Sequence, residues 1–316
     1  MNQTNPLDVL TKKNLLIYTG SLGILLIAAT VIFGYHVLLL ALVSYAVGLF
    51  IEWLFAHFRK KPFDPSWMVT PLVITLLLPP TAPLWLAGIA SGFGVMFGKA
   101  IFGGLGKNVF NPALVGILFV WISFPVQMAT TWLNPINGDI IASATPLMQF
   151  NGGALLYSFE QLLFGNVPGT LGETFRLGII VLGLLLVVLK VSDWRIPLAF
   201  LSTVLVLTFL VSLIASKPVV DPMYSLFVGG VLFGAFFVAT DPATSPRTDY
   251  GKFIFGIGAG FLTVLIRHFA AAPEGVLFAI ILMNALAPLI DSSLLERAKK
   301  KSQALGQDTE KVEEAQ

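Results

Sequence analysis

Residues 37–55 read VLLLALVSYAVGLFIEWLF, and Glu52 is the one charged side chain among these 19 residues. A helix rises about 1.5 Å per residue, so this run is about 28 Å long, close to the thickness of about 30 Å of the hydrocarbon core of a bilayer. Backbone polar groups inside lipid must be paired within their own segment, which a helix achieves. The run therefore predicts a transmembrane helix.

Similar apolar runs recur along the whole chain, and together they predict an all-α polytopic membrane protein with about ten transmembrane helices. Two of the runs, around Pro71 and after Asn111, are short for a full crossing. We expect them to be broken or half helices buried among their neighbours. The ten predicted spans are residues 14–33, 37–55, 67–78, 82–102, 111–124, 175–189, 196–215, 223–240, 253–266 and 275–290.

The composition excludes several classes of protein. Of the 316 residues, 56% are hydrophobic and 11% are charged, the net charge is +2, and the mean hydropathy is +0.85. A soluble domain carries about 25% charged residues. The basic residues lie in short clusters between apolar runs, which argues against a nucleic-acid-binding surface. The chain has no cysteine, so it has no disulfide, no thiol catalysis and no Cys-ligated iron–sulfur cluster.

The basic residues also indicate the orientation, because cytoplasmic loops of membrane proteins collect Lys and Arg. With the N-terminus inside and ten crossings, 16 of the 19 basic residues fall on the cytoplasmic side. The three that remain outside are Arg176, Lys217 and Arg267. Both termini are therefore predicted to be cytoplasmic, and residues 125–174 are predicted to form one long extracytoplasmic segment.

Two polar ends flank the predicted spans. Residues 1–13 have no following cleavage site of small residues, so we expect a cytoplasmic N-terminus before an uncleaved first span and not a signal peptide. Residues 294–316 form a charged cytoplasmic tail, for which a solvated helix or a disordered end is the simplest expectation.

Ten spans divide into two five-helix halves, residues 14–124 and 175–293. An odd number of crossings places the halves in opposite orientations, which is the inverted repeat of many transport folds. A weak internal sequence repeat supports this division, because a Phe-Gly pair precedes both the Asn-Pro-Ala sequence at Asn111 and the Asp-Pro-Ala sequence at Asp241. We therefore expect Asn111 and Asp241 to hold equivalent places in the two halves.

The extracytoplasmic segment contains the sequence DIIASATPL at residues 139–147. The simplest interpretation is a surface loop in which the hydroxyl of Thr145 has no special role. The alternative is a modification site, because small neighbours in an accessible loop leave room for a bulky group that an enzyme attaches through a phosphate. Both interpretations are open on physical grounds alone.

The Asn-Pro-Ala block predicts a helix start, with Asn111 at the N-cap and Pro112 at the first helical position. The N-terminus of a half helix is a positive dipole end that can face an anion or a polar ring. The preceding Gly106-Lys107 pair is not a Walker phosphate loop, because position 108 is Asn. The glycines at 94 and 98, and those from 256 to 260, are interpreted as helix-packing faces.

Ionisable side chains are rare inside the predicted spans. Glu52 lies near the cytoplasmic end of its span, close to His57 and Arg59, which favours a structural salt bridge. No row of carboxylates indicates a proton wire, and the sequence predicts neither a metal site nor a catalytic residue. An ion path made of hydroxyls and backbone carbonyls at the broken helices, and a path through other subunits, both remain open.

The pattern Asp-x-x-[Ser/Thr]-[Gly/Ser]-Ala-Thr resembles the site at which a flavin transferase links FMN through its phosphate to a threonine. Asp139, Ser143 and Ala144 match this pattern, and Thr145 falls on the acceptor position. Ala142 departs from it, since Ser or Thr is usual there.

The Asn-Pro-Ala and Ala-Thr-Asp-Pro blocks lie on either side of this site. In that order, over roughly residues 10 to 295, they resemble the membrane-protein family shared by the D subunit of Rnf complexes and the B subunit of sodium-pumping NADH:quinone reductase. The Ala-Thr-Pro-Leu sequence and the short N-terminus favour the Rnf type.

The resemblance implies a bacterial cytoplasmic-membrane subunit that passes electrons through covalent FMN and often holds a second, non-covalent riboflavin. It implies coupling of electron flow between ferredoxin and NAD to the movement of Na⁺ or H⁺. The implied partners are the other Rnf subunits (A, B, C, E and G), a flavin transferase and membrane lipid, with no nucleic acid. The candidate cofactor-binding residues are Thr145, Asp139, Ser143, Ala144, Asn111 and Asp241.

Two other functions compete with this one. A five-plus-five inverted repeat with paired half helices also builds channels and carriers for small neutral solutes. A purely structural membrane scaffold is the third possibility. Bound flavin distinguishes the first function from the other two, because a flavoprotein is yellow and a covalent flavin fluoresces in a denaturing gel.

Overall fold

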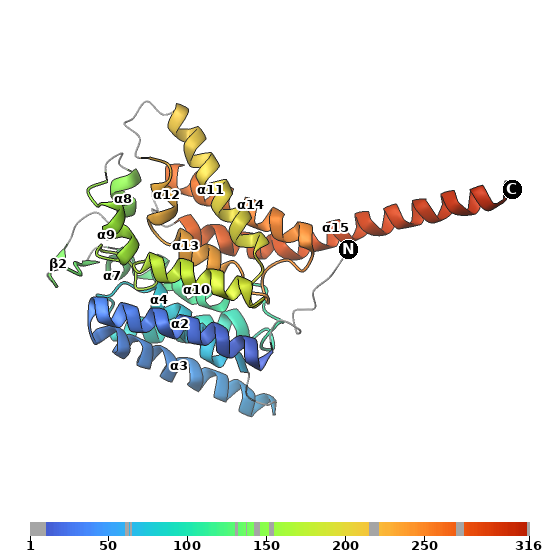
Figure 1. Cartoon of the computed structure of the whole chain (residues 1–316). Helices are drawn as coiled ribbons and strands as arrows, with labels where there is room; N and C mark the ends of the chain where they lie inside the picture. The colour runs from blue at the N-terminus through green and yellow to red at the C-terminus, as the bar shows by residue number, and fades with distance from the viewer. Residues whose placement is uncertain are drawn as a thin grey trace.

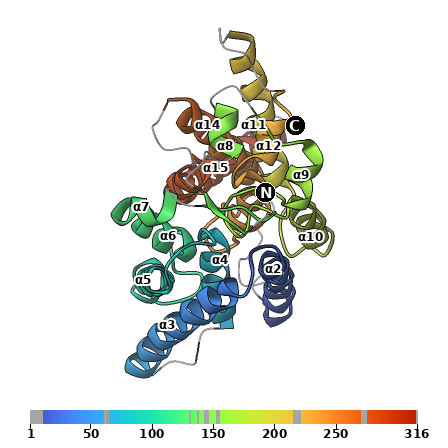
Figure 2. The same ribbon diagram turned by 90° about the vertical axis from the view of Figure 1, so that its left-hand side faces the viewer.

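The computed structural model describes residues 11–60, 63, 65–129, 132–136, 138–141, 146–151, 155–214, 221–269 and 275–314. Figures 1 and 2 show a bundle of helices with one small hairpin, which confirms the prediction of an all-α polytopic membrane protein. Five helices of the described part are long and apolar enough to cross a membrane. They are α2 (Lys12–Phe33), α3 (His36–Arg59), α11 (Arg195–Ile214), α14 (Asp249–Phe269) and the apolar part of α15 (Gly275–Glu314).

Shorter helices occupy the other predicted spans. The two short spans of the first half are short helices in the structure, and the span predicted at 223–240 is interrupted after Phe227, a break that the sequence analysis did not predict. These elements are η1 (Pro65–Met68) with α4 (Val69–Leu77), α5 (Leu84–Val95) with η2 (Met96–Ala100), α6 (Pro112–Ser123), α10 (Arg176–Val188), and α12 (Tyr224–Phe227), α13 (Val231–Phe233) and η3 (Gly234–Val238).

The segment between the halves is folded. Its elements are α7 (Pro125–Ala129), β1 (Trp132–Leu133), β2 (Ile140–Ile141), α8 (Pro146–Asn151) and α9 (Phe159–Phe164). The two strands form an antiparallel hairpin in which Trp132 pairs with Ile141. In Figure 1 these elements lie at one end of the bundle, and the start of α2 and the projecting end of α15 lie at the other. This placement agrees with the predicted separation of residues 125–174 from the termini.

The first helices of the two halves run in opposite directions. Asn14 at the start of α2 and Ser192 just after the end of α10 line one cavity. Ile32 near the end of α2 lies against Gly165, which closes α9 shortly before α10 begins. An antiparallel pair of leading helices is what an inverted repeat requires. The rotation that relates the complete halves stays a prediction.

Small residues allow several helices to approach closely. A Cβ atom added at Gly94 would lie 2.5 Å from the carbonyl oxygen of Pro112, and one at Gly116 would lie 2.1 Å from that of Ala90. A Cβ atom added at Gly256 would lie 2.7 Å from the carbonyl oxygen of Ile196. The interpretation of these glycines as packing faces is confirmed, because no larger side chain fits between the backbones.

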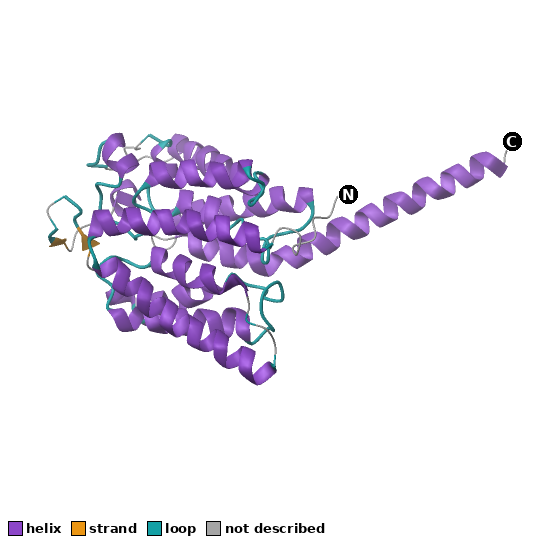
Figure 3. Cartoon of the chain, turned by 60° about the horizontal axis from the view of Figure 1, so that its bottom comes forward, coloured by secondary structure: helices purple, strands orange, loops and turns teal. Residues whose placement is uncertain are grey.

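The two ends of the helical region differ in how they stop. At the start of α2, the side chain of Thr11 accepts a hydrogen bond from the amide of Asn14 at 3.2 Å, which caps the helix. At the other end of the chain, α15 continues past the predicted span and projects from the body as far as Glu314 (Figures 1 and 3). Of the two structures expected for the tail, the helix is the one found in its described part.

Candidate functional site

Three of the predicted site residues, Ser143, Ala144 and Thr145, lie outside the described residues, as does Ala142. Asp139 is described and exposed. Its carbonyl oxygen accepts a hydrogen bond from the amide of Asn134 at 2.9 Å, which closes the turn of the β1–β2 hairpin. The attachment pattern therefore begins in an exposed hairpin.

On its other side the attachment pattern is followed by an anchored helix. Pro146, directly after Thr145, begins α8 and is buried. Leu147 is 1% exposed and packs in a small apolar cluster of its own. The chain thus passes from a solvent-exposed turn to a fixed helix within a few residues of Thr145.

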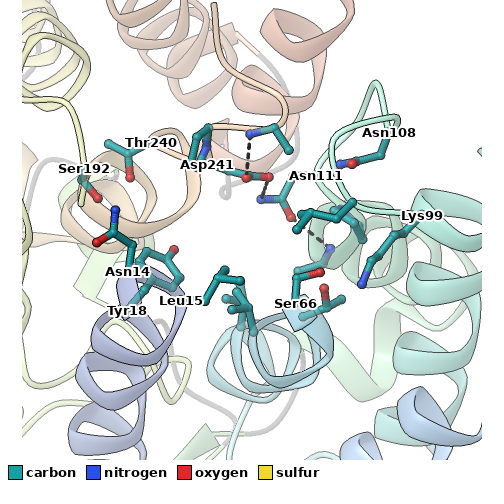
Figure 4. A pocket seen from close by; sticks show the side chains of 18 of the residues that line it. Asn14, Leu15, Tyr18, Ser66, Lys99, Asn108, Asn111, Ser192, Thr240 and Asp241 are labelled. Atoms are coloured by element: carbon teal, nitrogen blue, oxygen red, sulfur yellow. Dashed lines mark hydrogen bonds between the residues drawn. The ribbon is translucent and has the colours of Figure 1, made fainter. Parts of the chain in front are cut away.

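A cavity between the two halves forms the second candidate site (Figure 4). Its walls combine aliphatic side chains with amide, hydroxyl and charged groups. Both of the other predicted residues, Asn111 and Asp241, line it. The remaining lining residues are Asn14, Leu15, Tyr18, Ser66, Val69, Thr70, Val73, Lys99, Leu105, Asn108, Pro112, Ala113, Val191, Ser192, Thr240, Pro242 and Ala243.

Asn111 and Asp241 are in direct contact. The Nδ2 of Asn111 donates a hydrogen bond to the Oδ2 of Asp241 at 3.3 Å, across 130 residues of sequence (Figure 4). The Oδ1 of Asn111 accepts from the amide of Ala113 at 3.0 Å, so Asn111 is the N-cap of α6 as predicted. This contact joins the two halves at the wall of the cavity.

The prediction that Asn111 and Asp241 hold equivalent places is wrong. Counted within its own half, Asn111 precedes the fifth helix, whereas Asp241 follows the third, which is the broken one. In an inverted repeat the third helix of one half corresponds to the third helix of the other, and the fifth to the fifth. The similar Phe-Gly and Pro-Ala sequences around Asn111 and Asp241 are therefore not caused by the repeat. The two blocks resemble each other and meet face to face, but each occupies a different position in its half.

Asn284 completes this polar contact from a third direction. Its Oδ1 accepts from the backbone amide of Asn111 at 3.2 Å, and its Nδ2 donates to the carbonyl oxygen of Thr244 at 3.2 Å. The hydroxyl of Thr244 donates to Asp241 at 3.1 Å. Sequence analysis missed Asn284, although a lone amide in an otherwise apolar span was the signal that could have found it.

A buried ion pair lies beside the cavity. The Nζ of Lys99 contacts the Oε1 of Glu52, and the two side chains are 2% and 8% exposed. The predicted salt bridge of Glu52 therefore exists, and Lys99, which the sequence analysis did not predict, is a partner. The guanidinium group of Arg59 donates to the carbonyl oxygens of residues 100 and 101. Sequence spacing could not indicate this pairing, because 47 residues separate the partners.

Two π-helical turns end near this cavity. They are η2, which contains Lys99, and η3, which precedes Thr240 and Asp241. The hydroxyl of Tyr18 on α2 donates to the carbonyl oxygen of Phe237 within η3. A π-helical turn is rare and is frequent at functional sites. Its presence on both sides of the cavity marks this place more clearly than any sequence motif did.

Asn108 contributes a buried polar atom that points to a ligand. The residue is 6% exposed, its Nδ2 donates to the carbonyl oxygen of Phe110 at 3.1 Å, and its Oδ1 has no hydrogen-bond partner among the described residues. A buried acceptor without a donor costs about 1 to 3 kcal/mol. A bound molecule with an N–H or O–H group would remove that cost.

The comparisons with known proteins agree with this architecture. Residues 8–300 match the profile of the NQR2, RnfD, RnfE family. The chain is 35% identical to the D subunit of the ion-translocating oxidoreductase complex of Yersinia pseudotuberculosis, over 84% of this chain and 88% of that protein. It is 36% identical to the D subunit of the proton-translocating ferredoxin:NAD(+) oxidoreductase complex of Clostridium ljungdahlii, over 82% of each chain.

A relative of the second kind aligns over a smaller share of its length. The B subunit of the Na(+)-translocating NADH-quinone reductase of Ectopseudomonas mendocina is 38% identical over 80% of this chain and 66% of its own. The match to the family profile covers nearly the whole chain and both of its halves. This chain belongs to the NQR2, RnfD, RnfE family.

Proposed function

We propose that this chain is the membrane component corresponding to the D subunit of an Rnf-type ion-translocating oxidoreductase, and that it carries electrons through FMN esterified to Thr145. The observation that carries the proposal is the attachment pattern from Asp139 to Thr145, in a chain whose relatives are named as subunits of such complexes. The exposed hairpin before Thr145 supports it, because a transferase must reach the hydroxyl.

The position of the segment favours the same proposal. The hairpin before Thr145 and α8 after it lie at the end of the bundle away from the start of α2, which favours a phosphate at the surface that need not enter lipid (Figure 1). Asp139 fixes the hairpin turn through its backbone carbonyl, and α8 fixes the residues after Thr145. When bound, a flavin supplies one- and two-electron redox chemistry.

The test of this proposal is removal of the acceptor hydroxyl. Thr145→Ala, produced with a flavin transferase, should lose in-gel flavin fluorescence and abolish electron transfer by the complex while the spans remain inserted. Thr145→Ser keeps a hydroxyl and measures how strictly the transferase demands threonine. Ser292→Ala removes an exposed hydroxyl outside this segment and should keep the fluorescence. Fluorescence that survives Thr145→Ala contradicts the assignment.

We further propose that the central cavity holds the second, non-covalent flavin, riboflavin. The polar edge of such a ring system offers N–H donors, which suit the unpaired Oδ1 of buried Asn108. Aliphatic side chains such as Leu15 and Val73 suit its apolar part. Asn111 and Asp241 orient each other at the wall and hold the two halves together around the cavity.

Flavin analysis of the denatured protein tests the second site. Asn108→Leu should lower the amount of riboflavin released on denaturation and leave the covalent flavin fluorescence unchanged. Asn166→Ala, an exposed amide away from the cavity, serves as the matched control. Equal release from the parent protein and from Asn108→Leu would contradict this placement.

The same proposal includes the partners and the coupling. We propose assembly with the other Rnf subunits (A, B, C, E and G), and coupling of ferredoxin and NAD redox chemistry to the translocation of Na⁺ or H⁺. Purification through a tag on this chain should recover the other subunits together with ferredoxin:NAD oxidoreductase activity. Recovery of a flavin-free chain that transports a small neutral solute would support the channel alternative instead.

A further inference from the structure

A break in the helix between α12 and α13 lies at the extracytoplasmic end of the second half. α12 ends at Phe227, and Gly229 adopts a φ of +65°, so the chain turns before α13 begins at Val231. The carbonyl groups at the end of a helix have no partners in that helix and must be satisfied by other groups. Inside a membrane protein, water is not available for this role at depth.

Arg176 satisfies part of this break. It lies at the start of α10 and is 2% exposed. Its Nε donates to the carbonyl oxygen of Phe227, and its Nη1 donates to the carbonyl oxygens of Leu162 at 2.8 Å and Thr174 at 3.1 Å. One guanidinium group thus joins the end of α12, the helix α9 and the residues before α10.

Arg267 bonds two more carbonyl groups at this break. It lies in the last turn of α14 and is 6% exposed. Its Nη1 donates to the carbonyl oxygen of Ser225 at 3.1 Å, and its Nη2 donates to that of Val228 at 2.9 Å. Burial raises the pKa of Glu173, while the charges of Arg176 and Arg267 oppose this rise and favour its carboxylate form.

The same break supports the helix beside Thr145. Leu147 and Phe150 of α8 belong to an apolar cluster with Leu162 of α9, Val167, and Val228 at the break. Arg176 bonds the carbonyl group of Leu162, and Arg267 bonds that of Val228. Two residues of this cluster are therefore fixed by the arginines through their backbones.

We infer that Arg176 and Arg267 are positioning residues for α8, the helix that follows Thr145 directly in the sequence: their guanidinium groups fix the break after α12 and the helix α9, and through these they hold α8 in place. The consequence for electron transfer rests on the proposed function, whereas the anchoring of α8 does not. Both arginines were exceptions to the basic-inside pattern. Their burial against backbone carbonyls explains why they lie on the outer side.

Arginine suits this role better than lysine. Its planar fork offers five donors in fixed directions and remains charged, so one side chain can bond several carbonyl groups. A lysine at either position keeps the charge but offers one compact ammonium group. Arg176→Lys keeps the positive charge but loses the several N–H donors of the guanidinium group, so it distinguishes the effect of the donors from the effect of the charge.

Cysteine labelling tests the anchoring directly, because the chain has no native cysteine. Leu147→Cys places a thiol at a position that is 1% exposed, so it should react slowly with an impermeant maleimide. Combined with Arg176→Gln or Arg267→Gln, the labelling rate should rise at least about tenfold, as expected when a buried interaction that limits opening is lost. Arg176→Lys should also label faster than the parent, since the fork is missing.

Two further variants keep the test decisive. Gly229→Ala strains the same break without touching a charge and should also raise the labelling rate, which covers the case in which an arginine variant does not fold. Arg195→Gln removes a partly exposed arginine from the opposite end and should leave the rate unchanged. Parent-like labelling in the folded arginine variants and in Gly229→Ala would overturn the inference.

The functional consequence has its own readout. In the assembled complex, Arg176→Gln should keep the fluorescence of the covalent flavin but lower the rate of electron transfer, because displacement of a reacting centre by about 1 Å can cost about a hundredfold in rate. An unchanged rate with faster labelling overturns the positioning role. Absence of the covalent flavin from the parent protein as well would defeat the proposed function, and the labelling result would still decide the anchoring.

Discussion

Buried charges serve different purposes at the two ends of this molecule. At the end near the termini, Lys99 and Glu52 pair with each other, side chain to side chain. At the opposite end, Arg176 and Arg267 bond backbone carbonyl groups around a broken helix, with Glu173 as their counter-charge. The first arrangement neutralises two charges, whereas the second replaces hydrogen bonds that the broken backbone cannot make.

This difference determines which of the buried charged residues can be replaced by apolar ones. A buried pair of side chains can be exchanged for apolar groups of similar volume at little cost, provided that both members change together. Carbonyl groups cannot be removed by mutation. An arginine that satisfies them therefore has no compensating second mutation, and the predictions below use this contrast.

The largest effect is expected at the arginines. Arg176→Met should lower the free energy of unfolding by about 3 to 5 kcal/mol, because it leaves three carbonyl groups without their donor and removes a positive charge that acts on buried Glu173. The double variant with Glu173→Gln should recover little of this loss. Thermal unfolding of the purified protein in detergent measures both. Full recovery in the double variant would mean that the charge pair, and not the backbone, is what Arg176 serves.

The ion pair at the other end should behave in the opposite way. Lys99→Met or Glu52→Leu alone should cost about 3 to 5 kcal/mol, since each removes the ion-pair partner of a buried charge. The double variant should return to within about 1 to 2 kcal/mol of the parent protein. Thermal unfolding in detergent measures the stability of these variants. A double variant as unstable as the single ones would show that the ion pair cannot be replaced by apolar groups and does not differ from the arginines in this respect.

A smaller effect is expected at the contact between the halves. Asn111→Ala removes the N-cap of α6 and the hydrogen bond to Asp241, so it should cost about 1 to 2 kcal/mol. Asn111→Asp keeps the cap acceptor but brings a second carboxylate to Asp241, and should be no more stable than Asn111→Ala at neutral pH. Asn166→Ala provides the control. An unchanged melting temperature for both variants would show that the contact does not hold the halves together.

The smallest effect is expected where charges meet water. Burial tends to raise the pKa of Asp193, but hydrogen bonds from Lys252 and from the amide of Arg195, with their charges, outweigh it and lower the pKa below its ordinary value. A lowered pKa stabilises the fold above about pH 4, and this stabilisation is lost as the pH falls further. Asp193→Asn should therefore cost up to about 1 kcal/mol at pH 7 and less near pH 3. A cost that does not depend on pH would contradict the assignment.

The sequence was sufficient to predict where the membrane-spanning helices lie, except for the break after Phe227. A run such as 37–55 can be recognised as a transmembrane helix from its own residues, because a segment that crosses the bilayer must be helical, apolar and about 20 residues long. Every predicted span coincides with helical residues in the described structure, and Asn111 caps its helix as predicted. Local rules of length, hydropathy and capping were enough for these features.

Other features depend on residues far apart in the chain and could not be predicted. The pairing of Glu52 with Lys99, the contact between Asn111 and Asp241, and the π-helical turns all arise from packing between helices. The sequence around Phe227 is a continuous apolar run, so it gives no local sign of the helix break. The groups that stabilise the break are arginines of α10 and α14, which donate to its carbonyl groups. Sequence analysis placed those arginines outside but gave no reason for their position.

The mass of the peptide that contains Ala144 and Thr145 shows whether FMN is esterified to this chain. The protein is produced with a flavin transferase, the active complex is purified and digested, and the peptide is measured by mass spectrometry. The account predicts a peptide heavier by the mass of FMN less one water, with the modification on Thr145. An unmodified peptide from a complex that still transfers electrons would contradict it.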